Sequence, residues 1–290
     1  METIMNVKNF FDKDTSTLSY VVFDKITKDC LVIDPVLNFD LEESTFSTQS
    51  IDQVYKFIKK NNFNLHMILE THAHADHLSG AQFMKDKFPK SKLAIGENIK
   101  SVQKTFKHIF NFKNFNENGL QFDLLLKDNS VCSVGSFKIK TLFTPGHTPA
   151  CVSYLINEKI IFTGDVLLMH DFGTGRCDFP GGSSEQMYNS IKTKLYTLPD
   201  NVKVFVGHDY MPNGRKLGYK STIGIQKKLN PHINSMTQKK QFIKNRDNRD
   251  KTLKSPRLLL QSLQVNIDAG KLPVKEQNKQ RYLKIPINQK

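Results

Sequence analysis

The segment THAHADH, residues 71–77, carries four side chains that can bind a metal ion: His72, His74, Asp76 and His77. Ionisable groups of this kind are costly to bury in a protein interior when they have no partner, and a bound metal ion commonly offsets that cost. Imidazole and carboxylate ligands suit zinc or iron, and the segment offers no thiolate. The pattern therefore predicts a metal-binding loop.

Three more residues of the same kind follow short apolar segments later in the chain. His147 stands in FTPGHT, Asp165 in IIFTGD and His208 in VFVGHDY. Each segment has the apolar, β-branched character of a strand, so each side chain is expected at a strand end, where loops carry function. One such residue alone would be typical of a structural role. Together with residues 71–77 they predict one shared metal site.

The strands and helices that would position these residues can be read from hydrophobic periodicity. Apolar or alternating runs predict strands over residues 18–24, 29–35, 65–71, 92–96, 137–143 and 202–209, and a hairpin over residues 151–165. Helical spacing of apolar side chains predicts helices over residues 51–60, 78–88, 97–110 and 183–198. This alternation predicts an α/β fold in which two packed sheets carry helices on their outer faces.

In this order the motifs resemble the metallo-β-lactamase fold superfamily, over roughly residues 15–215. The resemblance implies an αββα sandwich of two mixed sheets with the metal site at one edge of both. Asp34, in VIDP, matches the early aspartate that supports the metal loop in this family. The resemblance also implies ligands for two metal ions: His72, His74 and His147 for one, Asp76, His77 and His208 for the other, and Asp165 as a bridge.

The segment GTGRCDFPGG, residues 173–182, resembles the persulfide dioxygenase branch of this superfamily. That branch, also called sulfur dioxygenase, holds a single iron(II) ion by two histidines and one aspartate, which by position are His72, His147 and Asp165. Such a ligand set leaves coordination positions open, and the reaction requires them because O₂ and a persulfide sulfur must meet. The resemblance therefore implies oxidation of glutathione persulfide, or of a similar low-molecular-weight persulfide, to sulfite.

The same resemblance assigns roles around the metal. Arg176 and Asp209 are the candidate catalytic residues, and Arg176 and Tyr210 are the candidates for binding a substrate carboxylate. Asp34 and Asp178 are expected to orient the metal ligands through hydrogen bonds. For Arg176 a second interpretation stays open, since a salt bridge to a neighbouring aspartate would also fix its loop.

The 290-residue chain has a formal net charge of +14, and the excess lies in its C-terminal quarter. Residues 213–290 contain 19 Lys and Arg against four Asp and Glu. We therefore predict a catalytic domain over residues 1–213 and a basic, largely helical extension over residues 214–290 that packs on it. The four dispersed cysteines favour a reducing compartment, and the N-terminal residues lack the apolar core of a signal peptide. We accordingly expect a cytoplasmic protein without a membrane span.

Two other functions remain open on the sequence alone. A zinc-dependent hydrolase of the glyoxalase II type, acting on glutathione thioesters, would use all seven ligand-type residues in a dinuclear site. The basic extension would suit a nucleic-acid-binding or nucleic-acid-processing protein, but it shows no RNA-binding motif, and its aromatic residues form no stacking pattern. The expected partner is therefore a small-molecule persulfide or thioester rather than a nucleic acid. Whether the chain forms a homo-oligomer is left open.

Overall fold

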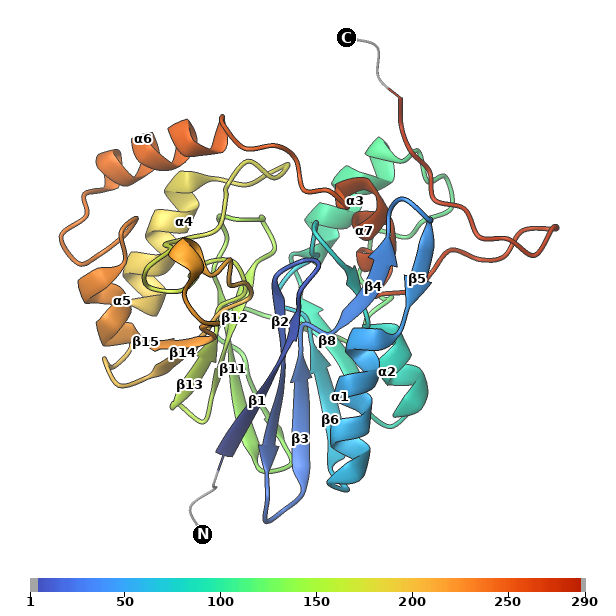
Figure 1. The fold of residues 1–290 in the computed structure, drawn as a ribbon, viewed down its shortest axis with the longest axis horizontal. Coiled ribbons are helices and arrows are strands. Elements are labelled where there is room, and N and C mark those ends of the chain that lie inside the picture. The colour runs from blue at the N-terminus through green and yellow to red at the C-terminus, as the bar shows by residue number, and fades with distance from the viewer. Residues whose placement is uncertain (1–4, 288–290) are drawn as a thin grey trace.

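Two six-stranded sheets form the centre of the computed structural model, which describes residues 5–287 (Figure 1). The first sheet contains, in spatial order, β1 (Met5–Asp12), β2 (Thr17–Asp24), β3 (Asp29–Ile33), β6 (Asn64–Leu69), β8 (Lys92–Gly96) and β9 (Leu124–Leu126). The second contains β10 (Val131–Val134), β11 (Phe137–Phe143), β12 (Val152–Ile156), β13 (Ile160–Phe162), β14 (Lys203–Phe205) and β15 (Lys220–Thr222). A small third sheet contains β5 (Thr45–Ser47), β4 (Val36–Asp40) and β7 (Leu78–Ser79). Both large sheets are mixed, because each combines parallel and antiparallel pairs.

Helices cover the outer faces of the two large sheets (Figure 1). The first sheet is covered by α1 (Gln49–Lys60), α2 (Ala81–Lys87) and α3 (Ile99–Ile109). The second is covered by α4 (Ser184–Ser190) with its π-helical continuation (Ile191–Leu195), α5 (Ile223–Leu229) and α6 (Lys239–Asp250). In α1 the reason is visible in the sequence: Ile51, Val54 and Ile58 share one helical face and are buried, whereas Lys59 and Lys60 are exposed. This layer order confirms the predicted α/β sandwich.

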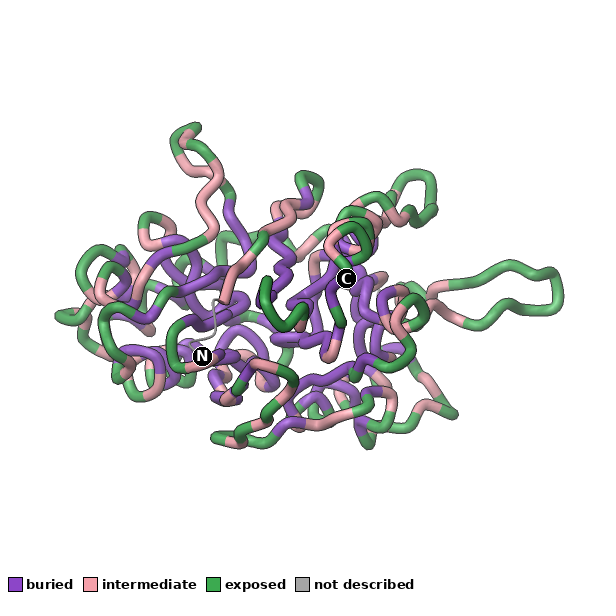
Figure 2. Tube along the Cα trace, turned by 90° about the horizontal axis from the view of Figure 1, so that it is seen from below, coloured by how far each residue is buried: buried purple, intermediate pink, exposed green. Residues whose placement is uncertain are grey.

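The space between the two sheets is filled by apolar and aromatic side chains. Tyr20 of the first sheet meets Phe162 and Phe205 of the second edge to face, with ring centroids 5.1 and 5.5 Å away. The Tyr20 hydroxyl donates a hydrogen bond of 2.6 Å to the carbonyl oxygen of Val206, so its buried polar atom is satisfied. Figure 2 shows buried segments throughout the interior of both halves and exposed residues on the loops. The interior thus fixes how the sheets face each other.

The two sheets are joined by backbone hydrogen bonds beside the segments that follow β6 and β14. The amide of Val152 donates to the carbonyl oxygen of Thr71 at 2.9 Å, and the amide of Leu18 donates to that of Gly207 at 2.8 Å. His72 and His208 come directly after these two carbonyl groups. The packing of the sheets therefore brings together residues that are more than 130 positions apart in the sequence.

Several elements differ from the sequence-based predictions. The strand β1 was not predicted, and residues 78–79 form the strand β7 before α2 begins, because they pair with β4. The helix expected over residues 183–198 begins as predicted at the N-cap Ser183, whose hydroxyl accepts from the amide of Gln186, but it continues as a π-helix after residue 190. No helix in residues 5–287 is both long enough and apolar enough to cross a bilayer.

The C-terminal part is only partly helical. The boundary predicted at residue 213 falls inside a 3₁₀ turn (Pro212–Gly214). The strand β15 follows this turn and pairs with β14, so the second sheet continues past the predicted boundary. The chain then forms α5, α6 and α7 (Leu259–Asn266), and α7 packs on β7 of the metal-loop side. Residues 271–287 contain no regular helix or strand. The extension therefore touches both halves of the sandwich (Figure 1).

Candidate metal centre

Three buried side chains from three different strand ends converge on one point. His72 follows β6, His147 follows β11 and Asp165 follows β13. Each offers one ligand atom, and these atoms lie within 4.8 Å of one another. Their exposed fractions are 1%, 6% and 8%. Two imidazoles and one carboxylate in this arrangement form the 2-His-1-carboxylate set that leaves part of a coordination sphere open.

Hydrogen bonds fix the orientation of both imidazoles in this set. The Thr71 hydroxyl donates to Asp34 at 2.8 Å, so it accepts from Nδ1–H of His72 at 3.0 Å. The backbone carbonyl of Arg176 can only accept, so Nδ1–H of His147 donates to it at 2.7 Å. Both rings consequently present the lone pair of Nε2 toward the centre, as a metal ligand must.

The centre leaves polar atoms without partners, which is the condition a metal ion would satisfy. Within the described part of the chain, Nε2 of His72 and Oδ1 of Asp165 accept no hydrogen bond although both are buried. Such atoms are costly to bury unless something else coordinates them. Burial, with the neighbouring His74 and His147, lowers the pKa of His72 well below its ordinary value, so its imidazole is neutral. The two imidazoles, the carboxylate and their buried atoms without hydrogen-bond partners therefore fit a bound cation.

His74 lies beside this set but faces two carboxylates instead. Its Nε2 is 3.2 Å from Oδ1 of Asp34 and 3.4 Å from Oε2 of Glu70, and all three side chains are buried. Although burial lowers the pKa of His74, Asp34 and Glu70 raise it well above its ordinary value. Asp34 is held in place by the Thr71 amide at 2.7 Å. In this structure His74 therefore groups with Asp34 and Glu70, and also with Asp76 and His77, rather than with the set formed by His72 and His147.

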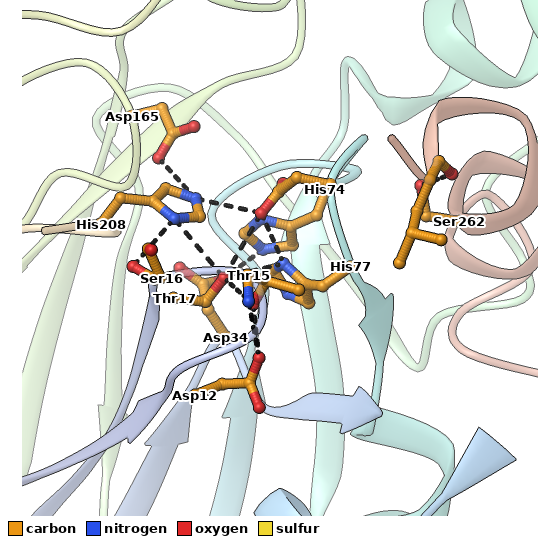
Figure 3. A network of polar contacts seen from close by, with 12 residues as sticks. Asp12, Thr15, Ser16, Thr17, Asp34, His74, His77, Asp165, His208 and Ser262 are labelled. Carbon is orange, nitrogen blue, oxygen red and sulfur yellow. Dashed lines mark hydrogen bonds and ion pairs between the residues drawn. The ribbon is translucent and has the colours of Figure 1, made fainter. Parts of the chain in front are cut away.

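The remaining ligand-type residues, Asp76, His77 and His208, form a second polar group around Thr17. Figure 3 labels Thr17, His77 and His208. Oδ2 of Asp76 lies 3.2 Å from Nδ1 of His77 and 3.3 Å from Nε2 of His208. The Thr17 hydroxyl is within 3.4 Å of all three side chains. Burial raises the pKa of Asp76, but His208 and His77 outweigh it, so that pKa is held well below its ordinary value.

His208 links this second group to the ligand set. Its Nδ1–H donates to the carbonyl oxygen of Ser16 at 3.2 Å, and its Nε2 is 3.4 Å from Oδ1 of Asp165 (Figure 3). Although burial lowers the pKa of His208, Asp165 and Asp76 raise it above its ordinary value. Among the described residues, the second compact ligand group joins Asp76 and His77 to His74 rather than to His208. All seven predicted ligands thus meet at one place, but their grouping differs from the symmetric dinuclear pattern.

A cavity of about 370 Å³ opens onto the centre. His147, Asp165 and His208 line it, and Leu168 and Phe172 contribute apolar surface to it. The volume falls in the range usual for small-molecule sites. Four cationic side chains also line it, namely Arg176, Arg246, Arg249 and Arg257. Part of the positive charge of the C-terminal extension is therefore directed at the metal centre.

Arg176 and Tyr210, the candidates for substrate binding, both line the cavity. The Arg176 guanidinium forms a paired hydrogen bond to the Asp178 carboxylate at 2.5 Å and also donates to the carbonyl oxygen of Lys254 at 2.7 Å. The Tyr210 ring stacks on His208, with an interplanar angle of 8°. Arg176 thus combines the salt bridge and the cavity position that the sequence offered as separate interpretations, and Asp178 supports Arg176 rather than a metal ligand.

Asp209 lies behind the site and is held by other groups. Its carboxylate accepts from the Arg215 guanidinium at 2.6 and 2.7 Å and from the amide of Gly218 at 2.6 Å. It is not among the described residues that line the cavity. These contacts favour a supporting role next to His208, and the catalytic role remains a prediction.

Sequence reasoning missed several residues that contact the centre. Glu70 carried a signal, because it is an acid directly after an apolar strand and directly before the metal loop. No sequence signal marked Thr17, Arg249 or Arg257, because each reaches the site only through the packing of segments that are distant in the sequence.

Comparison with known proteins agrees with this fold. The chain is 46% identical over 289 residues to "Glyoxylase B2" of Dictyostelium discoideum, covering 99% of each protein. It is 44% identical to a "Beta-lactamase hydrolase-like protein" of Xylella fastidiosa, of which it spans 64%. It is 28% identical to the human "Persulfide dioxygenase ETHE1, mitochondrial", covering 78% of this chain and 75% of that protein.

A solved structure and a family model support the same fold. The crystal structure of ETHE1 from Myxococcus xanthus matches with a TM-score of 0.73 and 27% identity, covering 92% of this chain and all of that one. Two packed mixed sheets with a histidine and aspartate cluster at the strand ends define a metal-binding αββα protein. The family model described as "Metallo-beta-lactamase superfamily" matches residues 12–208, and the chain belongs to that superfamily.

Proposed function

We propose that the protein is a cytoplasmic persulfide dioxygenase that uses one iron(II) ion held by His72, His147 and Asp165. Its substrate would be glutathione persulfide or a similar low-molecular-weight persulfide. In balanced form, one persulfide RSSH, one O₂ and one H₂O give the thiol RSH, hydrogen sulfite and one proton. Iron(II) bound there would supply the redox chemistry that joins O₂ to the terminal sulfur.

The grouping of the ligands carries this proposal. His72, His147 and Asp165 form one compact set, whereas the Nε2 atom of His74 lies between Asp34 and Glu70. A dinuclear hydrolytic site would need His74 in the same metal sphere as His72 and His147. A three-ligand site with open positions suits a reaction in which two small molecules must approach one metal. The similarity to the persulfide dioxygenase ETHE1 of several mammals supports the same assignment.

The cavity residues would bind and orient the substrate. Arg176, Arg249 and Arg257 suit the carboxylates of a thiol such as glutathione, because guanidinium groups bind carboxylates with paired hydrogen bonds. Leu168 and Phe172, which also line the cavity, would exclude water. The hydrogen bond from His147 to the backbone carbonyl of Arg176 connects a metal ligand to the loop that carries a carboxylate-binding candidate. Substrate binding and metal binding would therefore be coupled through this contact.

A second candidate function is a zinc-dependent thioester hydrolase of the glyoxalase II type. The relative named "Glyoxylase B2" favours it, because it is similar over nearly the whole chain. Asp76, His77 and His208 also favour it, because they remain close to the ligand set and could hold a second cation. In that case a metal-bound hydroxide would attack the thioester carbonyl.

The two functions can be separated by one experiment on the full-length chain. Protein purified without oxygen and loaded with iron(II) is mixed with glutathione persulfide, and O₂ consumption and metal content are measured on the same sample. We expect rapid O₂ uptake with one iron per chain. No uptake, together with hydrolysis of a glutathione thioester by protein holding two zinc ions per chain, would overturn the proposal in favour of the hydrolase.

The arginines of the extension give a prediction about substrate affinity. Replacing Arg249 with alanine should raise KM for glutathione persulfide by about 10-fold with a smaller change in kcat, because a charged hydrogen bond to a substrate carboxylate contributes about 1.5–3 kcal/mol. The matched control is Lys244→Ala, which removes a positive charge from the exposed face of the same helix. Steady-state kinetics on both variants checks this. Equal KM values for the two variants would contradict a substrate contact at Arg249.

A further inference from the structure

One asparagine of the C-terminal extension is bonded directly to the metal loop. The side-chain amide of Asn266, at the end of α7, donates to the carbonyl oxygens of His74 and His77, each at 2.8 Å. Its own oxygen accepts from the amide of Ser79 at 2.8 Å. Asn266 is 4% exposed, so water does not compete for these bonds. All three partners belong to the segment that carries His72, His74, Asp76 and His77, or to the strand directly after it.

The contact continues from Asn266 to the carboxylate cluster around His74. The Ser79 hydroxyl donates to the Glu70 carboxylate, whose other oxygen lies 3.4 Å from Nε2 of His74. Asn266 therefore holds the turn after His74 through the carbonyl group of His74. It also holds Ser79, which anchors the Glu70 carboxylate beside the His74 ring. Side chains and backbone of the loop are fixed from the same point.

The surrounding packing leaves little freedom at this contact. Gly270, just after α7, has a φ of +80°, and a Cβ there would lie 3.0 Å from the carbonyl oxygen of Ser79. The side chain of Gln103, on α3, donates to the carbonyl oxygen of Ile267 at 2.8 Å. The end of α7 is therefore packed closely against β7 and is also tied to α3 by a hydrogen bond.

We infer that Asn266 is a positioning residue of the metal centre, by which the C-terminal extension sets the shape of the metal-binding loop. Hydrogen bonds behind metal ligands commonly change metal affinity by about 10–100-fold when they are removed. A side-chain amide can bridge two carbonyl groups, because it has two N–H donors. The inference rests on the metal centre on which the proposed function also depends, but not on which reaction that centre catalyses.

The same helix offers a matched control. Gln264 is 6% exposed, and its amide donates to the carbonyl oxygens of Leu260 and Lys284 while its oxygen accepts from the amide of Lys284. Asn266 and Gln264 therefore have the same hydrogen-bonding pattern, two carbonyl acceptors and one amide donor. Only the partners of Asn266 lie in the metal loop. Asn266→Asp and Gln264→Glu each remove two donated bonds and keep the accepted one.

The experiment titrates cobalt(II) into the full-length metal-free protein and records the visible spectrum, with affinity measured by competition against a chelator. Asn266→Asp should weaken cobalt(II) binding about 10–100-fold relative to Gln264→Glu and change the spectrum of the bound ion. Thermal unfolding of the metal-free variants shows whether both fold. The apolar pair Asn266→Leu and Gln264→Met, which adds no charge, should show the same difference.

Three outcomes are distinct. Weaker binding and an altered spectrum in the Asn266 variants alone support the inference. Equal affinities and spectra in both members of each pair would overturn it, because Asn266 would then be no more than a structural contact. If the unaltered protein binds no cobalt(II), the metal centre itself is wrong and the proposed function falls with it. In that last case the inference is overturned too.

Discussion

Asp165→Ala protein should neither bind the catalytic metal nor oxidise a persulfide. Asp165 is the single carboxylate in the set with His72 and His147, and its Oδ1 is buried without a hydrogen-bond partner among the described residues. Removal of a supporting hydrogen bond alone commonly weakens metal binding about 10–100-fold, so removal of a ligand should exceed about 100-fold. Metal content after dialysis and O₂ uptake with glutathione persulfide measure the two losses on one sample.

The control for this prediction is Asp76→Ala, which removes a second carboxylate from the same cavity. If the centre is mononuclear, this variant keeps one metal ion per chain and most of its activity. If both variants lose metal and activity alike, the dinuclear hydrolase becomes the better explanation. A fully active Asp165→Ala enzyme would refute the ligand assignment itself, whatever the metal.

Much of the fold was predictable from local pattern. The apolar spacing in α1 and the alternation in β11 follow from burial of one face, and both elements lie where the sequence placed them. The two-residue strand β7 was not predictable, because it exists only through its pairing with β4. β1 pairs along its whole length with β2, yet its residues lack the buried side chains that mark a central strand.

The site was predictable to the extent that its residues carry their own chemistry. His72, His147 and Asp165 could be found because ligand-type residues after apolar strands meet at a sheet edge. The orientation of His74 could not be predicted, because it depends on Glu70 and on the left-handed backbone of Asp34, which has a φ of +46°. The contacts that the C-terminal extension makes with the site depend on where its helices pack. The spacing of residues in the sequence does not indicate that packing.

The variant Arg246→Met should be strongly destabilised, because it leaves a buried carboxylate without its partner. The Arg246 guanidinium donates to Asp250 at 2.5 and 3.0 Å and to the carbonyl oxygen of Thr174 at 3.2 Å. Asp250 in turn accepts from the amide of Cys177 at 2.8 Å. Arg246 and Asp250 are 4% and 6% exposed. Removing one partner of a buried ion pair typically lowers the free energy of unfolding by about 3–5 kcal/mol, a large share of the usual total of about 5–15 kcal/mol.

This pair matters for the site because it attaches an otherwise polar helix to a site loop. The buried residues of α6 are Phe242, Arg246 and Asp250, so apolar packing contributes little to its attachment. Urea denaturation of metal-free protein measures the free energy of unfolding. The double variant Arg246→Met, Asp250→Asn should recover part of the loss, because no unpaired charge is then buried. If the double variant is as unstable as Arg246→Met alone, the loss comes from packing of the arginine side chain rather than from the stranded carboxylate.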